Sequence, residues 1–211
     1  MRKIGILIVL VLVGCSTVSL QEDWKNPDIV IFDASKVLVV GLAQNIAARK
    51  EFENSLAQEF IKRDVEAVRS LDLFDIEFTN TKRSEEELTA LEQQLIDKDF
   101  DAILFTKLLG YESRETLRKR MADWDGYNIG FKDDYIGNQS VYYNEGYTDT
   151  FKVYHVQTSL YCICSGKERE LIWRGSIDIT DPVDIQKSIK EYVKLLTVAL
   201  EEQDLIFHSE K

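Results

Sequence analysis

The sequence predicts an α/β fold: a single domain with a mixed sheet, in the order βαβαββα, ending in an antiparallel hairpin and a final helix. Two observations predict this class. Short apolar, β-branched runs at 36–42 and 101–109 alternate with stretches that have the 3.6-residue period of amphipathic helices. The last third then changes to an alternation of apolar and polar residues, which is typical of antiparallel strands.

Three strands are expected in the first half of the chain. KVLVVGL, residues 36–42, is almost continuously apolar and ends at a leucine that follows a glycine. A short run of this kind is typical of a central strand that is buried on both faces. DAILFTKLL, residues 101–109, repeats the pattern, and VEAV at 65–68 predicts a shorter, less buried strand. Strands alternating with helices imply βαβ crossovers and a partly parallel sheet.

Two amphipathic helices are expected between these strands. From Asn45 to Arg63, apolar residues recur at helical spacing. The second helix is expected over about 84–98, because Ser84 followed by Glu87 forms a capping box ahead of an apolar stripe.

The last third of the sequence predicts a hairpin followed by a helix. In 153–164 the even positions are mainly apolar and the odd positions mainly polar, so we expect a strand with one face in water. Residues 171–179 form its partner. The inward-facing residues of that partner are expected to be Leu171, Trp173, Ile177 and Ile179. Asp181 and Pro182 are suited to the N-cap and first position of the final helix.

A tyrosine-rich insert at 110–150 interrupts this pattern and holds six of the nine tyrosines. Long loops inside compact domains are often functional, and aromatic residues mixed with Gly and Asn form adaptable contact surfaces. The alternative is an extra structural segment whose tyrosines cover the sheet. The residues predicted to form a contact surface are Tyr135, Tyr142, Tyr143 and Tyr147.

The amino terminus predicts export and lipidation. Arg2 and Lys3 precede a run of ten mainly apolar residues, which is too short to span a bilayer and has the features of a signal peptide. LVGC, residues 12–15, resembles a bacterial lipobox. That resemblance implies diacylation of Cys15, cleavage before it and acylation of the new amino terminus. The alternatives are an ordinary signal peptide followed by a chance cysteine, or a cytosolic protein with an apolar amino terminus.

These features divide the chain into a signal peptide at 1–14, a lipidated tether at 15–35 and an α/β domain at 36–205. Ser16 follows the cysteine, and this favours the outer membrane over inner-membrane retention. The membrane partner is therefore lipid, reached through acylated Cys15, with the domain facing the periplasm. No later segment approaches 18 apolar residues.

Charge restricts the possible partners. The net charge of −11 becomes −13 when the two basic residues of the signal peptide are removed. An acidic surface argues against nucleic acid or an anionic lipid surface, because both require basic patches. Another protein of the cell envelope is the expected partner.

No catalytic or cofactor site is expected. The chain has two histidines, His155 and His208, and neither belongs to a convincing Ser-His-Asp or Cys-His set. The loop after 36–42 has neither the glycines of a dinucleotide site nor a P-loop lysine. Asp133 and Asp134 form the one acidic pair beside aromatic residues, and they are a weak candidate for a catalytic or sugar-binding site. We therefore expect no enzyme activity and no cofactor.

Cys162 and Cys164 lie two residues apart, on one face of the expected strand. Their Cα atoms would be about 6.6–6.8 Å apart in a regular strand, at the limit for a disulfide. Two buried thiols are the favoured interpretation, and a strained disulfide is the alternative. Too few other ligands lie nearby for a metal site.

Five segments carry a resemblance that covers nearly the whole chain after residue 15. These are WKNPD, KVLVVGLAQNIAARKEFE, FDAILFTKLLG, VYHVQTSLYCICSGKERELIWRGSIDITDP and YVKLLTVALEE. They resemble a family of short, uncharacterised bacterial lipoproteins, and only Cys15 is carried over as a site residue. Some members are named cardiolipin synthetase, an activity that requires paired His-x-Lys motifs. His155 and His208 are each followed two residues later by other residue types.

The expected function is a lipid-anchored, non-catalytic protein-binding or assembly module of the envelope. The βαβαββα order is similar to small periplasmic modules of envelope lipoproteins that bind other proteins. The alternative is an accessory protein that binds glycan or lipid through the tyrosine-rich insert.

Overall fold

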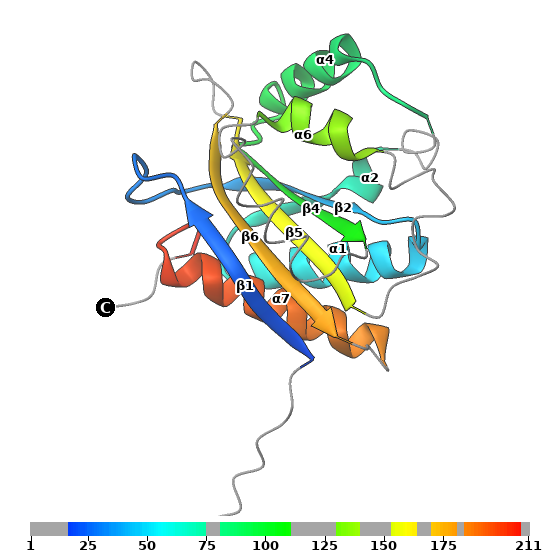
Figure 1. Ribbon diagram of the computed structural model, residues 1–211. Helices are drawn as coiled ribbons and strands as arrows, with labels where there is room; N and C mark the ends of the chain where they lie inside the picture. Colours follow the sequence, from blue (N-terminus) through cyan, green and yellow to red (C-terminus); the bar gives the residue numbers. More distant parts are fainter. Residues whose placement is uncertain are drawn as a thin grey trace, which may run out of the picture.

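The computed structural model describes residues 17–74, 81–110, 130–139, 153–163, 170–180 and 184–207. They form a six-stranded mixed sheet in the order β1-β6-β5-β4-β2-β3. Helices cover both faces, with α1 and α7 on one and α4 and α6 on the other (Figure 1). The predicted α/β class is confirmed.

The parallel half of the sheet is built around β2 (Lys36–Leu42). It pairs in parallel with β3 (Glu66–Arg69) on one side and with β4 (Ala102–Gly110) on the other. Nearly every side chain of β2 and β4 is buried. The continuous apolar runs therefore predicted central strands correctly, because both of their faces meet a helix layer.

Three of the described helices lie between these strands in the sequence. Helix α1 (Ile46–Ile61) begins at Asn45, whose side chain accepts a hydrogen bond from the Ala48 N–H at 2.9 Å. The short α2 (Ser70–Leu73) follows β3. Helix α4 (Glu85–Ile96) begins with the predicted capping box, in which Ser84 and Glu87 each accept the other's backbone N–H.

The antiparallel half consists of β4, β5 (Val153–Cys162) and β6 (Leu171–Thr180). Helix α6 (Phe131–Asn138) lies between β4 and β5 in the sequence and packs on the same face as α4. The predicted hairpin strands are confirmed. The rest of the tyrosine-rich insert lies outside the described residues.

The final helix, α7 (Ile185–Glu202), begins later than predicted. Its N-cap is Asp184, whose carboxylate accepts the Lys187 N–H at 3.1 Å. The prediction that Asp181 caps this helix is wrong, because Asp184 already satisfies a first-turn N–H group. Asp181 and Pro182 lie outside the described residues.

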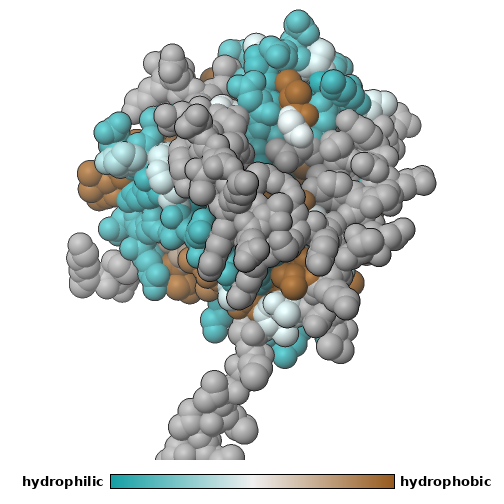
Figure 2. All heavy atoms as spheres, viewed as in Figure 1, coloured by the Kyte–Doolittle hydropathy of each residue, from teal (hydrophilic) through white to brown (hydrophobic). Residues whose placement is uncertain are grey.

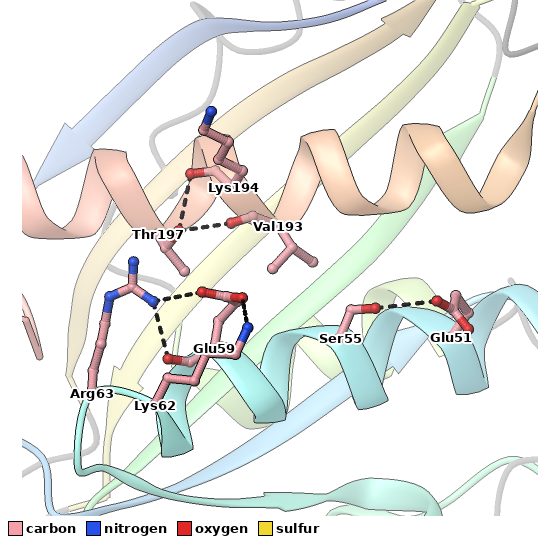
Figure 3. A network of polar contacts seen from close by, with 8 residues as sticks. All are labelled: Glu51, Ser55, Glu59, Lys62, Arg63, Val193, Lys194 and Thr197. Carbon is pink, nitrogen blue, oxygen red and sulfur yellow. Dashed lines mark hydrogen bonds and ion pairs between the residues drawn. The ribbon is translucent and has the colours of Figure 1, made fainter.

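Figure 3 shows α7 lying beside α1 across the strands. In the last turn of α1, Glu59 pairs with Lys62 at 2.6 Å and with Arg63 at 2.7 Å. Farther along, Thr197 of α7 donates to carbonyl groups of its own preceding turn. The Glu59 contacts are exposed, whereas Thr197 is 1% exposed. The core lies between the two helices and the sheet.

Part of the predicted tether is a strand. Residues of β1 (Val18–Lys25) pair antiparallel with β6 and form one edge of the sheet. The chain then stays against the domain, and Phe32 and Ala34 are each 8% exposed. The expectation of a tether over 15–35 therefore fails from residue 18 onward, because the outer backbone groups of β6 are paired by β1.

One face of β5 is polar but is not exposed to solvent. His155, Gln157 and Ser159 are at most 3% exposed, so the prediction that this face meets water is wrong. These side chains lie on the α4/α6 face of the sheet. His155 bonds Asp178 of β6 at 2.6 Å, and Ser159 accepts from Arg174 at 2.8 Å. Pairing across the strands replaces hydration for His155 and Ser159. The side-chain amide of Gln157 is buried without a hydrogen-bond partner among the described residues.

The register between β5 and β6 shifts between Leu160 and Tyr161. As a result Leu171 joins the core under α4 and α6, whereas Trp173, Ile177 and Ile179 belong to the core under α1 and α7. The predicted inward face is therefore correct for three of its four residues.

Cys162 is 4% exposed and disulfide-bonded, so the favoured interpretation of a buried free thiol is wrong. The strand ends at this residue, just after the register shift, so the spacing of a regular strand does not apply there. The other two cysteines, Cys15 and Cys164, lie outside the described residues.

The described surface in the view of Figure 2 is mainly hydrophilic, with small, separate hydrophobic patches. Residues Val30 and Ile31, in the loop between β1 and β2, are 79% and 57% exposed.

We predict that Gly175→Ala destabilises the domain by about 1–3 kcal/mol, the usual cost of overpacking. A Cβ atom at Gly175 would lie 2.3 Å from the ring of Trp173, which is fully buried and has no room to move. Urea unfolding followed by circular dichroism measures the loss. The control is Gly137→Ala in α6, where a Cβ atom meets nothing within 4 Å. Equal stability of the two variants would contradict the packing argument.

Candidate functional site

A pocket of about 460 Å³ lies at the carboxyl ends of β2 and β4, between the first turns of α1 and α7. The chain leaves β2 toward α1 on one face, while the next described helix after β4, α6, lies on the other face. Adjacent strands whose connections diverge in this way create a crevice, and open α/β sheets bind ligands there. The pocket therefore occupies the position at which this class of fold places ligands.

The walls of the pocket are mainly apolar. They come from six elements, β2, α1, β4, β5, β6 and α7, so no single sequence segment describes the pocket. The apolar residues that line it include Phe52, Leu108, Val156, Ile179, Ile185 and Ile189. Among the described residues that line it, none is Asp, Glu, His, Cys or Lys.

Two residues that line this pocket, Thr106 and Tyr192, bond through their hydroxyl groups to Thr158, which is fully buried. Thr158 lies between two partners, with its Oγ1 2.7 Å from Thr106 Oγ1 and 2.6 Å from the Tyr192 hydroxyl. Tyr192 is 2% exposed, and burial raises the pKa of its phenol above the usual value. Tyr192 therefore stays protonated at physiological pH. Because the hydroxyls bond one another, this wall tolerates an apolar ligand.

A buried ion pair fixes one side of the pocket. Glu53 of α1 is fully buried and accepts from Arg49 Nε at 3.0 Å and from the Ser70 hydroxyl at 2.6 Å. It also accepts the backbone N–H groups of Gly41 and Leu71, each at 3.0 Å. Arg49, which lines the pocket, donates in addition to Ser70 at 2.9 Å. One carboxylate thus joins the end of β2 to α1 and α2.

A second polar cluster lies on the opposite face of the sheet, around Asp134 of α6. Asp134 pairs with Lys107 of β4, accepts from the Tyr161 hydroxyl at 2.5 Å and lies 3.3 Å from Arg174 Nη2. All four side chains are at most 3% exposed. Burial lowers the pKa of Lys107, while the charge of Asp134 acts in the opposite direction. Burial and Asp134 together raise the pKa of Tyr161.

The structure separates the acidic pair noted in the sequence. Asp134 points into this buried cluster, whereas Asp133 is exposed on the other side of α6. The two carboxylates therefore do not form a common acidic site. His155, the one described histidine, also lies on this face, on the side of the sheet away from the pocket.

Tyr135 was expected on a contact surface and is instead buried. It is 4% exposed, and its ring centroid lies 5.8 Å from that of Phe105 and 6.0 Å from that of Phe131. Its position on the inner side of α6 explains the difference. The other residues predicted for the site are Cys15, Tyr142, Tyr143 and Tyr147; they lie outside the described residues and stay predictions.

Within the described part of the chain, no group of three or more His, Cys, Asp and Glu side chains is placed to hold a metal ion. No described helix is both long enough and apolar enough to cross a membrane.

Comparison with known proteins gives weak structural similarities. No protein-family model and no curated sequence matches the chain. PelC from Paraburkholderia phytofirmans, solved as a dodecamer, has a TM-score of 0.43 at 9% identity, over 89% of this chain and 98% of that one. Lipoprotein GNA1162 from Neisseria meningitidis has a TM-score of 0.39 at 13% identity, over 80% and 95%. Similarities at this level assign no function.

We predict that Glu53→Gln lowers the free energy of unfolding by about 3–5 kcal/mol, because it leaves the buried Arg49 without its counter-charge. The matched control is Glu59→Gln in the same helix, whose ion pairs are exposed and contribute about 0.2–1 kcal/mol. Chemical denaturation of both variants tests this difference. Similar losses in the two would show that the Glu53 pair does not hold this wall.

We predict that Asp134→Asn destabilises the domain more than Lys107→Met. The first change leaves two buried cations without the carboxylate, at a cost of about 3–5 kcal/mol. The second removes one cation and keeps Asp134 bonded to Arg174 and Tyr161. The comparison uses thermal and urea unfolding, and the reverse order of stability would contradict this assignment.

Proposed function

We propose that this chain is a lipid-anchored lipoprotein of the cell envelope whose α/β domain is a non-catalytic binding module. The anchor is an acylated Cys15, the membrane is the outer membrane, and the domain faces the periplasm. The observation that carries the binding role is the apolar pocket between α1 and α7, at the carboxyl edge of the sheet.

The size and lining of the pocket support binding of an apolar group. Ligand pockets usually have volumes of about 300–1,000 Å³, and this one has about 460 Å³. Each methylene group moved from water into such a site contributes about 0.8 kcal/mol. A sugar would need several polar partners, and the hydroxyls of this pocket already bond one another. The lining therefore favours an apolar ligand over a glycan.

The chemistry of the lining supports a binding role over catalysis. A general base or nucleophile needs an ionisable side chain with a pKa near the working pH. Tyr192 has a raised pKa, and Arg49 is held by Glu53 and Ser70. The hydroxyl of Ser188 donates to the Asp184 carbonyl at 3.0 Å. These side chains shape the pocket and are poorly suited to proton transfer.

A second envelope protein is the proposed partner, with Tyr142, Tyr143 and Tyr147 as its predicted contacts. Nucleic acid is excluded from the proposal because the net charge of the chain is −11.

The anchoring part of the proposal is tested by intact-mass spectrometry of the protein from membranes. We expect loss of residues 1–14 and a mass increase that corresponds to lipid on Cys15. The Cys15→Ser variant should lack this increase and leave the membrane fraction. An unmodified, full-length chain in the cytoplasmic fraction would contradict the proposal.

The binding part is tested with an apolar fluorescent dye, N-phenyl-1-naphthylamine. We expect saturable binding that falls at least tenfold in Ala48→Phe, because Ala48 lines the pocket and a phenyl ring would fill it. The control is Ala47→Phe, since Ala47 is exposed on the same helix and does not line the pocket. Equal dye affinity for both variants would overturn the assignment of the pocket.

A further inference from the structure

The pocket opens at the end of the sheet where the described chain begins. The carbonyl of Thr17 accepts the Thr180 N–H at 2.9 Å, and Val18 pairs with Ile179, a residue of the pocket wall. The Thr17 hydroxyl also lies 3.4 Å from Glu191 of α7. Cys15 precedes Thr17 by two residues, and two residues of extended chain span at most about 7 Å. A short segment therefore joins the predicted lipid attachment point to the strand that begins at the pocket end of the sheet.

The rim of the pocket is apolar and exposed at the same end. Ile185, a pocket residue and the first residue of α7, is 51% exposed. Ile46, the first residue of α1 and next to the pocket residue Asn45, is 42% exposed. Large apolar side chains beside a binding site usually mark a contact with another apolar surface. Ile185 and Ile46 therefore extend the apolar surface of the pocket to the outside of the domain.

Basic residues flank this end of α7. Lys187, Lys190 and Lys194 are all exposed on the first turns of the helix, in a chain whose net charge is −11. Glu191 lies among them and pairs with Lys187 at 3.7 Å. Lysines next to a membrane surface each contribute about 1 kcal/mol of attraction to anionic headgroups. The acidic surface as a whole argues against an anionic lipid surface, and this row is a local exception that favours lipid at the pocket end.

We infer that the pocket between α1 and α7 binds a long acyl chain. The ligand enters with its apolar tail first, past Ile185, and lies along the apolar walls as far as Thr106 and Tyr192, whose hydroxyls are already bonded to Thr158. This inference deepens the proposed function and rests on it for the position of Cys15. Two sources supply the same chemistry: a lipid of the surrounding membrane, or an acyl group on Cys15 itself, which leaves the remaining acyl chains as the anchor.

Palmitate is the probe that tests the inference, with binding measured by native mass spectrometry and calorimetry on the Cys15→Ser variant. We expect one palmitate per chain, with affinity lowered at least tenfold when Ala48→Phe is added. Val156→Phe fills the pocket from the β5 side and should have the same effect, so the test survives if one variant folds poorly. Ala47→Phe serves as the control and should retain full affinity.

Binding of the dye without saturable binding of palmitate would overturn the inference of an acyl ligand, while the proposed binding role would stand. Absence of both dye binding and palmitate binding would overturn the proposed binding role as well. The natural acylated protein, in detergent micelles, identifies the source. If it binds no added palmitate while Cys15→Ser does, its own acyl group occupies the pocket. If both bind, the acyl chain comes from a membrane lipid.

Discussion

The buried carboxylate of Glu53 is the interaction on which the pocket end of this domain depends. It accepts from two side chains and two backbone N–H groups, which belong to β2, α1 and α2. A buried charge is tolerated only when its hydrogen-bonding capacity is used, so these elements are held in one arrangement. With Glu53 in place, Arg49 and Phe52 have fixed positions in the pocket wall.

The two faces of the sheet both bury apolar side chains but differ in the polar groups among them, and this difference bears on where a ligand is accommodated. Toward α4 and α6, buried polar side chains include Lys107, which pairs with Asp134 of α6, and His155, which bonds Asp178. Toward α1 and α7, the side chains are mainly apolar, and the pocket lies at the carboxyl edge of the sheet. An apolar pocket gains free energy when an apolar ligand fills it.

The sequence predicted those parts of the fold that depend on local patterns. The apolar runs of β2 and β4 and the capping box at Ser84 and Glu87 act within a few residues, and all were located correctly. The edge strand β1 has no such pattern, since its partner β6 lies about 150 residues later and its exposed side chains are polar. A strand of this kind is recognised only through its pairing.

The candidate site was harder to predict for the same reason. Its walls come from β2, α1, β4, β5, β6 and α7, so no contiguous motif marks it. The burial of Tyr135 depends on which side of α6 meets the sheet, and the polar face of β5 is buried against β6, where Asp178 bonds His155. A polar residue in a strand indicates a need for partners, and water is only one possible partner.

The central claim is that the end of the domain nearest Cys15 takes an acyl chain between α1 and α7. Methyl NMR of the Cys15→Ser variant with spin-labelled stearate tests it most directly, because the label broadens nearby signals. The account predicts selective broadening of the methyl signals of Ile185, Ile189 and Val156, while those of Leu88 and Leu91 on α4 stay sharp. Broadening that is equal on both faces, or absent from the pocket, would contradict it.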